Sequence, residues 1–248
     1  LTSCSLDGRP VICGPLKPDF WRAATDNDRR GWKTDVLLDF WKQAEMRMTV
    51  KDLAVSKGAG RVVVTVEKSI PDTLSLTLTY TIGGGGVVEV GYVLRHLNPQ
   101  LPEMLRVGMQ TQCSADYDRM TFYGRGPHEN YSDRCLSAFV SVYDGRVDDF
   151  CYDYVRPQEN GNRTGVRWLS LRNAAGRGVQ FIGRQPLSVA VRRCSPEALE
   201  RAEHISEAEC SPDRLTVNID LVQAGVGGTD SWSIKARPEM PYRLCEKV

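Results

Sequence analysis

The chain has 248 residues, of which 25% are charged, and its formal net charge is +1 at pH 7. This balance of signs offers no basic face for nucleic acid or an anionic membrane, and no apolar run approaches the roughly 18 residues that a membrane span needs. The eight cysteines include no Cys-x-x-Cys pair, so we expect mostly reduced thiols that fill the core. All-β sandwiches often reach this length as one unit, and we expect a single domain over residues 1–248.

The first predicted elements are a helix and a hairpin. Apolar residues return on one side over 35–46, which predicts a short amphipathic helix. Over 74–82 apolar residues take every second place, and after the four glycines of 83–86 the alternation resumes over 88–94. This pattern predicts a β-hairpin with a glycine turn.

Later segments are also mostly strands. Ser195 followed by Pro196 predicts the start of a short helix that ends near Glu203. Many short strands separated by Gly- and Pro-rich turns favour an all-β fold, a large antiparallel β-sandwich with one or two short helices. The further strands are predicted at 62–66, 179–181, 187–191 and 215–221.

Four polar loops separate these strands, and each mixes aromatic residues with Asn, Asp or Glu. Such loops on a rigid sheet are where recognition usually takes place. In the first loop Asp26 and Asp28 flank Asn27, a pattern that fits either cation ligation or an Asx turn. No glycine and distal glutamate follow in the register of a calcium loop, so we favour the turn. The loops span 20–28, 122–131, 156–161 and 227–232.

Two loop glutamates, Glu129 and Glu159, are the candidates for an acid/base pair. Retaining hydrolysis would require their carboxyl groups to lie roughly 5–5.5 Å apart, and the sequence does not give this distance. Carboxylates beside tight turns more often accept backbone hydrogen bonds, so we favour structural roles for both. The histidines His96, His128 and His204 lack metal-binding spacing, and no cofactor or metal site is expected in this chain.

Trp232 follows a Gly-Gly turn and small polar residues rather than an alternating strand. An indole in such a turn can offer its face to a sugar ring, whose C–H side is apolar enough to stack on an aromatic surface. The alternative is a tryptophan that plugs the end of the core. The residues alone leave both interpretations open.

Taken together, the loops resemble the last domain of the large multidomain β-galactosidases of glycoside hydrolase family 2. The motifs follow the family order over most of the chain. They are Asp26-Asn27-Asp28, the Gly-x-Gly-Pro-x-Glu-Asn-Tyr-x-Asp-Arg run of 124–134, Pro-x-Glu-Asn-Gly at 157–161 and Gly-x-Gly-Gly-x-Asp-Ser-Trp at 225–232.

The resemblance implies a galactose-mutarotase-like supersandwich at the C-terminus of an enzyme that hydrolyses terminal β-D-galactosides with retention. It implies that the catalytic glutamates, and most ligands of the Mg and Na ions that the family uses, lie in other domains of the same polypeptide, chiefly a (β/α)8 barrel. The isolated chain would then be inactive, and the parent enzyme is expected to be a homo-oligomer.

The resemblance also implies two contributions of this chain to the active site. Trp232 would contact the substrate and form part of the wall for the leaving sugar. An active-site loop is implied at Gly108, Met109, Gln110 and Thr111, continuing to about Tyr117 and hinged at its glycine. We therefore expect partners of two kinds, a β-galactoside and the remaining domains, with no nucleic acid and no membrane.

Two other classes of protein stay open. A stand-alone carbohydrate-binding module would need a complete binding surface rather than one tryptophan. An aldose mutarotase of the same sandwich type would need an acid and a base near the anomeric oxygen, typically His with Glu, and the three histidines lack that pattern. The linkage preference and the compartment, cytoplasm or periplasm, are not given by the residues.

Overall fold

The structure, a computed structural model, describes residues 1–245. Strands dominate it and the helices are short, which confirms the predicted all-β, antiparallel class. The chain divides into two compact units: the first comprises Leu1–Trp41 and Met104–Leu244, and the second comprises Lys42–Glu103 with Cys245. The prediction of one domain over 1–248 stays a prediction.

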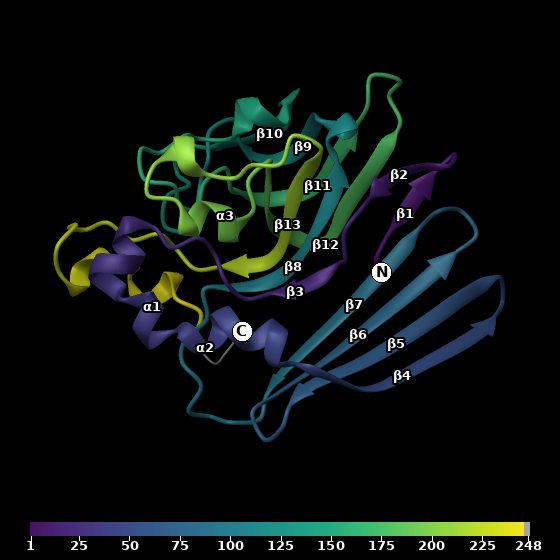
Figure 1. The fold of residues 1–248 in the computed structure, drawn as a ribbon, viewed down its shortest axis with the longest axis horizontal. Coiled ribbons are helices and arrows are strands. Elements are labelled where there is room, and N and C mark those ends of the chain that lie inside the picture. The colour runs from purple at the N-terminus through teal and green to yellow at the C-terminus, as the bar shows by residue number, and fades with distance from the viewer. Residues whose placement is uncertain (246–248) are drawn as a thin grey trace. The chain divides into compact units, whose positions relative to one another are not determined.

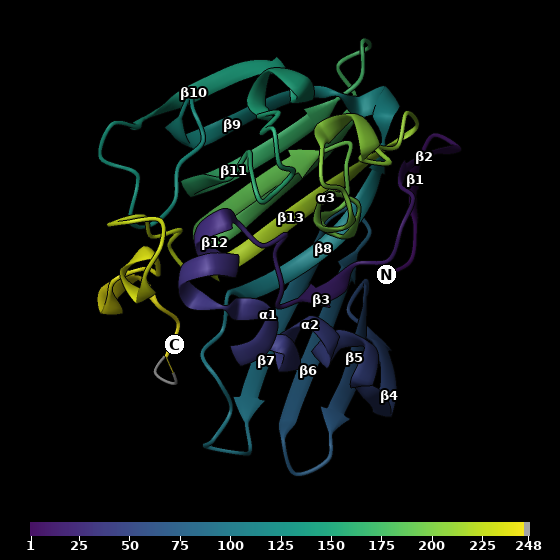
Figure 2. The ribbon, with the colours of Figure 1, turned by 60° about the vertical axis from the view of Figure 1, so that its left-hand side comes forward.

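The first unit is built on an antiparallel sheet that has nine strands within the described residues (Figures 1 and 2). Side by side they run β1-β2-β8-β13-β12-β11-β9-β10, and β3 also pairs with β8. In chain order the strands are β1 (Cys4–Leu6), β2 (Arg9–Ile12), β3 (Lys17–Asp19), β8 (Arg106–Ser114), β9 (Arg119–Gly126), β10 (Phe139–Arg146), β11 (Arg163–Arg172), β12 (Gly178–Arg192) and β13 (Arg214–Gln223).

One face of this sheet carries the apolar core. Side chains alternate across a strand, and Leu215 and Val217 of β13 are buried on the same side as Val189 and Val191 of β12. The 3₁₀ turn Val147–Phe150 packs its apolar residues into the same cluster. We call this side of the sheet the apolar face.

The opposite side of the same strands is also buried but polar. Thr216, Asn218 and Asp220 alternate with the apolar residues of β13, and the register places Arg106 of β8 and Arg192 of β12 on their side. All five residues are at most 3% exposed. We call this side the polar face, and its charges need partners because burial removes them from water.

The second unit is a four-stranded antiparallel sheet in the order β4-β5-β6-β7. The predicted hairpin is confirmed, with every second residue of β6 buried from Leu74 to Tyr80. Strand β4 is exposed along its whole length. The strands are β4 (Thr49–Gly58), β5 (Arg61–Ile70), β6 (Leu74–Gly83) and β7 (Val88–His96).

The helices are short, as expected. The predicted helix over 35–46 forms as α1 (Thr34–Leu37) and α2 (Asp39–Arg47), which are separated at Leu38. The helix α3 (Pro196–Arg201) begins as predicted, because the Ser195 hydroxyl accepts a hydrogen bond from the backbone N–H of Ala198 at 3.1 Å. Among residues 1–245 no helix is long and apolar enough to cross a membrane.

Two predicted strands join into one. The segments 179–181 and 187–191 both belong to β12, which runs without a break from Gly178 to Arg192. Its ladder with β11 is irregular, since Leu187 pairs with Val166 and Ile182 pairs with Trp168. Pro186 lies in this irregular stretch, where a missing N–H costs no ladder hydrogen bond.

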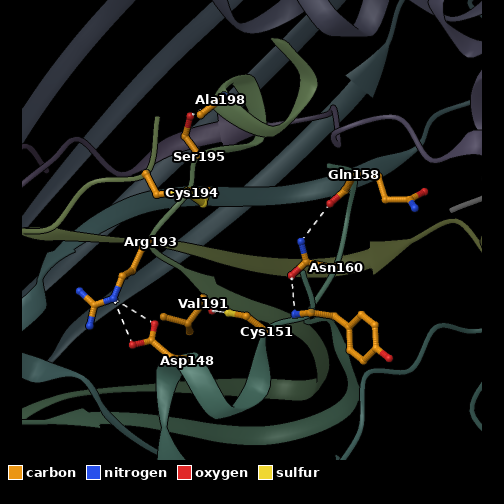
Figure 3. Close-up of a disulfide and its surroundings, with 11 residues drawn as sticks. Asp148, Cys151, Gln158, Asn160, Val191, Arg193, Cys194, Ser195 and Ala198 are labelled. Carbon is orange, nitrogen blue, oxygen red and sulfur yellow. Dashed lines mark hydrogen bonds and ion pairs between the residues drawn. A yellow bond between two sulfur atoms is a disulfide. The ribbon is translucent and has the colours of Figure 1, made fainter. Parts of the chain in front are cut away.

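One pair of cysteines forms a disulfide. Cys194 and Cys210 are bonded across α3 (Figure 3), and in the described part of the chain the other six cysteines are outside any disulfide. Of those six, Cys113 is buried in the apolar core and Cys4 is exposed. The expectation that the thiols fill the core is therefore wrong for five of these six cysteines, since only Cys113 is buried.

Candidate functional site

The four polar loops meet within the first unit. We call residues 20–28, 127–134, 156–161 and 225–232 the loop cluster, because residues 122–126 of the predicted second loop instead form the end of β9. Each loop of the cluster is hydrogen-bonded to another loop far away in the sequence. The links include Arg22 Nη2 to Gly225 O (2.8 Å), Glu159 N to Ala23 O (2.9 Å) and Gly161 N to Glu129 Oε2 (2.9 Å).

A buried ion pair organises the first loop. Arg22 donates from Nε and Nη2 to the two carboxylate oxygens of Asp28, at 3.0 and 2.8 Å, and both side chains are fully buried. Asp28 also accepts from the backbone N–H of Thr25 at 3.0 Å. The backbone N–H of Asp28 donates in turn to Thr25 Oγ1 at 3.1 Å, so Thr25 and Asp28 cap each other at the start of a helical turn. Residues 26–28 are therefore helical rather than the Asx turn that the sequence analysis favours.

The loop that carries Trp232 is held by carboxylate and amide groups from two other loops. Asp133 accepts from the backbone N–H groups of Val226 and Gly227, at 3.0 and 2.7 Å, and Asn27 donates to the Val226 carbonyl at 3.0 Å. A Cβ at Gly225 would lie 2.3 Å from the Asp133 carboxylate, and Gly227 has a φ of +66°. These contacts explain why the turn is built from glycines.

The indole of Trp232 points away from the core, since the residue is 80% exposed. Its backbone is nevertheless fixed, because Asp230 accepts from the N–H groups of Trp232 (3.3 Å) and Ser233 (3.0 Å). The Ser233 hydroxyl also bonds to Asp230, and this bond is the main reason that the pKa of Asp230 is lowered. The result is an exposed aromatic surface on a braced turn, not a plug in the core.

The predicted active-site loop at Gly108, Met109, Gln110 and Thr111 is wrong. These residues lie in the interior of strand β8, buried and paired with β13 on one side and β3 on the other. Gly108 is no hinge: it faces Asp220 across the ladder, and an added Cβ would lie 2.1 Å from that carboxylate. The glycine makes room for a buried acid.

Arg106 is the centre of a network that the sequence analysis missed. Its guanidinium group donates to Asp19 at 3.0 Å and to Glu159 at 3.3 Å, and its Nε lies 3.0 Å from Asp220. A further bond to the Trp21 carbonyl, at 3.0 Å, ties the first loop to the strand. Glu159 and Asp220 are fully buried and Asp19 nearly so. We call these groups, with Arg192 and Asn218, the polar network.

The network shifts the pKa values of its acids in different directions. Burial raises the pKa of Glu159, but the guanidinium groups of Arg192 (at 3.1 Å) and Arg106 outweigh it and hold that pKa below its usual value. Burial raises the pKa of Asp220 well above its usual value, although Arg106 opposes the shift. Burial also raises the pKa of Asp19, against the opposing effect of Arg106. Two guanidinium groups balance two carboxylates, so this group of five charges is neutral when one of its three carboxyl groups holds a proton.

Glu129 also serves to join loops. Its Oε1 atom accepts from Tyr154, and from Arg134 at 3.0 Å, while Oε2 accepts from the backbone N–H of Gly161. Glu129 and Glu159 thus both take the structural role that the sequence analysis favours for them. No group of three or more His, Cys, Asp or Glu side chains within residues 1–245 is placed to hold a metal ion.

Comparison with known proteins identifies the family of this chain. The model of the family described as β-galactosidase small chain matches residues 1–247. A β-galactosidase of Priestia megaterium is 36% identical over 92% of this chain, and those of Halalkalibacterium halodurans and Vibrio cholerae are 32% and 31% identical over 96% and 94%.

The chain belongs to the β-galactosidase small chain family. It spans only 22 to 24% of the length of these three relatives. A relative's complete activity therefore involves a much longer polypeptide than the one described by this structure.

Proposed function

We propose that the chain is the C-terminal domain of a glycoside hydrolase family 2 β-galactosidase and that it completes the active-site wall for the leaving sugar. The observation that carries the proposal is the exposed indole of Trp232 on its braced turn. An aromatic face held in place without being buried is suited to stacking on a pyranose ring. The short coverage of the relatives supports a role as one part of a larger enzyme.

In this proposal the bond-breaking groups lie outside the chain. Hydrolysis of a terminal β-D-galactoside with retention needs a nucleophile and an acid/base carboxyl. Glu129 and Glu159 are engaged by Arg134, Gly161, Arg106 and Arg192 instead. The nucleophile and the acid/base would come from a (β/α)8 barrel of the same polypeptide, which would also hold most ligands of the Mg and Na ions.

The direct test changes Trp232 in the complete β-galactosidase. Trp232→Ala is expected to lower kcat/KM for lactose about 2- to 10-fold, because one stacked aromatic contributes about 0.5–1.5 kcal/mol, while Trp232→Phe keeps most of the activity. The matched control is Phe139→Ala, another aromatic residue that is 76% exposed. Equal losses in the alanine variants of Trp232 and Phe139, or no loss in either, would refute the role.

The 248-residue chain alone provides a second test. It is expected to give no hydrolysis of a chromogenic β-galactoside. Turnover that disappears in Glu129→Gln or Glu159→Gln would contradict the proposal and make the chain an enzyme by itself. Sub-millimolar lactose binding that is lost in Trp232→Ala would instead favour a stand-alone carbohydrate-binding module.

A further inference from the structure

A hollow in the first unit is lined in part by the second loop of the cluster, through Pro127, His128, Glu129 and Arg134, but not by the Trp232 turn. Its volume is about 550 Å³, within the range of small-molecule sites. Its lining combines aromatic rings with charged side chains of both signs. The lining residues used below are Glu129, Arg134, Asp149, Phe150, Tyr152, Tyr154 and Arg163.

The aromatic side of the hollow is formed by two tyrosines. The rings of Tyr152 and Tyr154 lie 4.9 Å apart, and Tyr152 is 61% exposed. Tyr154 bonds to Glu129, and burial followed by this bond raises its pKa to about 12, so it stays a neutral donor. Tyr152 thus offers a free aromatic face backed by a fixed neighbour.

The backbone at Cys151 and Tyr152 is held by hydrogen bonds to two other segments. Cys151 donates from Sγ to the Val191 carbonyl at 3.3 Å (Figure 3), and the N–H of Tyr152 donates to Asn160 Oδ1 at 3.3 Å. Asn160 in turn donates to the Gln158 carbonyl at 2.9 Å (Figure 3). A ligand that stacks on Tyr152 would therefore meet a backbone that is already ordered, which lowers the entropic cost of binding.

The charges around the hollow cancel. The lining contains two carboxylates, those of Glu129 and Asp149, and two guanidinium groups, those of Arg134 and Arg163. Arg163 is buried, donates to the carbonyls of Pro127, Asn162 and Phe150, and lies with its guanidinium carbon 5.3 Å from the centroid of the Phe150 ring. Burial lowers its pKa to about 10, so it remains charged at neutral pH. A balanced pocket of this kind favours a neutral ligand over an anion or a cation.

Donors and acceptors remain for such a ligand. Arg134 is exposed and uses one of its N–H groups on Glu129, while Asp149 accepts a backbone N–H through Oδ2 and shows no partner for Oδ1 among the described residues. A neutral molecule that both donates and accepts hydrogen bonds around an apolar C–H face is a saccharide. We propose that this hollow is a second saccharide-binding site, separate from Trp232 and centred on Tyr152.

The test is NMR titration of the 248-residue chain, labelled with ¹⁵N, with methyl β-D-galactoside and with glucose. We expect millimolar binding that shifts the backbone amides of Tyr152, Tyr154 and Arg134, and about a tenfold loss of affinity in Tyr152→Ala. The exposed control Phe139→Ala should bind as the wild type does. Because Tyr152 is exposed, its replacement is expected to leave the rest of the spectrum in place.

Three results would overturn the inference. The first is the absence of amide shifts at the hollow with either sugar at about 100 mM. The second is binding that Tyr152→Ala leaves intact while Trp232→Ala abolishes it, which would assign the sugar to the Trp232 turn alone. The third is a proline-rich decapeptide that shifts these amides when the sugars do not, which would make the hollow a peptide site. Failure here leaves the role of Trp232 in the complete enzyme to its own test.

Discussion

The two faces of the large sheet's centre are equally buried and chemically opposite. On the apolar face, Leu215 and Val217 of β13 pack among aliphatic and aromatic neighbours. On the polar face, Asp220 of the same strand lies in a network of charges around Arg106. The apolar side is stabilised by the removal of surface from water, whereas the polar side is stable only while every charge has its partner.

This difference indicates which face of the sheet positions the loops. The polar network reaches beyond the sheet: Arg106 bonds to the Trp21 carbonyl, and Glu159 bonds through its backbone to Ala23. The apolar cluster is formed by strand residues and short turns instead. We infer that the apolar face supplies stability, while the polar face also fixes the geometry of the loop cluster.

The largest expected effect comes from breaking the polar network at its centre. Arg106→Met leaves Asp19, Glu159 and Asp220 without their shared cation, and we expect a loss of about 3–5 kcal/mol in the free energy of unfolding. Urea denaturation of the 248-residue chain measures it. The control is Arg119→Met, because the Arg119–Asp144 pair is solvent-exposed and should cost less than about 1 kcal/mol. Similar losses in both variants would show that the network has no special weight.

A comparable but smaller loss is expected on the apolar face. Leu215→Ala removes a fully buried side chain and should cost about 3 kcal/mol through lost burial and the cavity left behind. Leu221→Ala on the same strand is the matched control, because Leu221 is 43% exposed. The guanidinium unfolding midpoints of the two variants are compared. A loss of stability in Leu221→Ala as large as that in Leu215→Ala would contradict the expectation.

Gly108 is the point where the polar face tolerates no side chain. Gly108→Ala places a Cβ 2.1 Å from the Asp220 carboxylate and 2.7 Å from its Cα, so we expect a loss of about 1–3 kcal/mol from overpacking. Gly91→Ala in β7 is the control, since its Cβ would meet Thr79 at an ordinary 3.5 Å. Thermal unfolding of the two variants is the measurement, and Gly108→Ala should show the larger drop in Tm. A Gly108→Ala chain as stable as wild type would show that the close approach of Asp220 does not require a glycine at this position.

Local patterns predicted those parts of the fold that depend on neighbours in sequence. The alternation over 74–82 and 88–94 is enough for a hairpin: one face of β6 is buried, and the alternating residues of β7 pair with it across the ladder. The start of α3 follows from Ser195 and Pro196, whose roles are set within four residues. The exposure of Trp232 was not decided by its neighbours in sequence, and only the structure chooses it over a plug in the core.

The strand at Gly108–Thr111 could not be recognised in this way. Polar residues fall on one side of it and apolar ones on the other, but the polar side is buried by groups from distant segments. Asp19 lies 87 positions away from Arg106 in the sequence, and Arg22 lies 203 positions away from Gly225. A buried polar face resembles a solvated loop until its partners are known, which is why the convergence of the loops appears only in the structure.

The smallest expected effect is the response of the polar face to pH. Burial raises the pKa of Asp220, with Arg106 opposing. The carboxyl is therefore more acidic in the unfolded chain than in the folded one. Its contribution to stability is complete below the unfolded pKa of about 3.9 and is lost as the pH rises towards the folded pKa. Asp220→Asn removes this loss. The free energy of unfolding of the variant should therefore rise relative to that of the wild type between about pH 5 and about pH 8.

At neutral pH the Asp220→Asn substitution itself should cost within about 1 kcal/mol, because an amide matches a protonated carboxyl in shape and keeps an oxygen beside Arg106. Asp144→Asn is a control with the opposite sign, because bonds from Arg119 and Thr121 lower the pKa of Asp144. The free energy of unfolding of this variant should fall relative to that of the wild type as the pH rises from about 3 to about 5. The urea unfolding midpoints of both variants and of the wild type, measured across the two pH ranges, test both expectations. If the free energies of unfolding of Asp220→Asn and wild type differ by a constant amount from pH 5 to 8, Asp220 is ionised in the folded chain. The polar face would then carry a net negative charge.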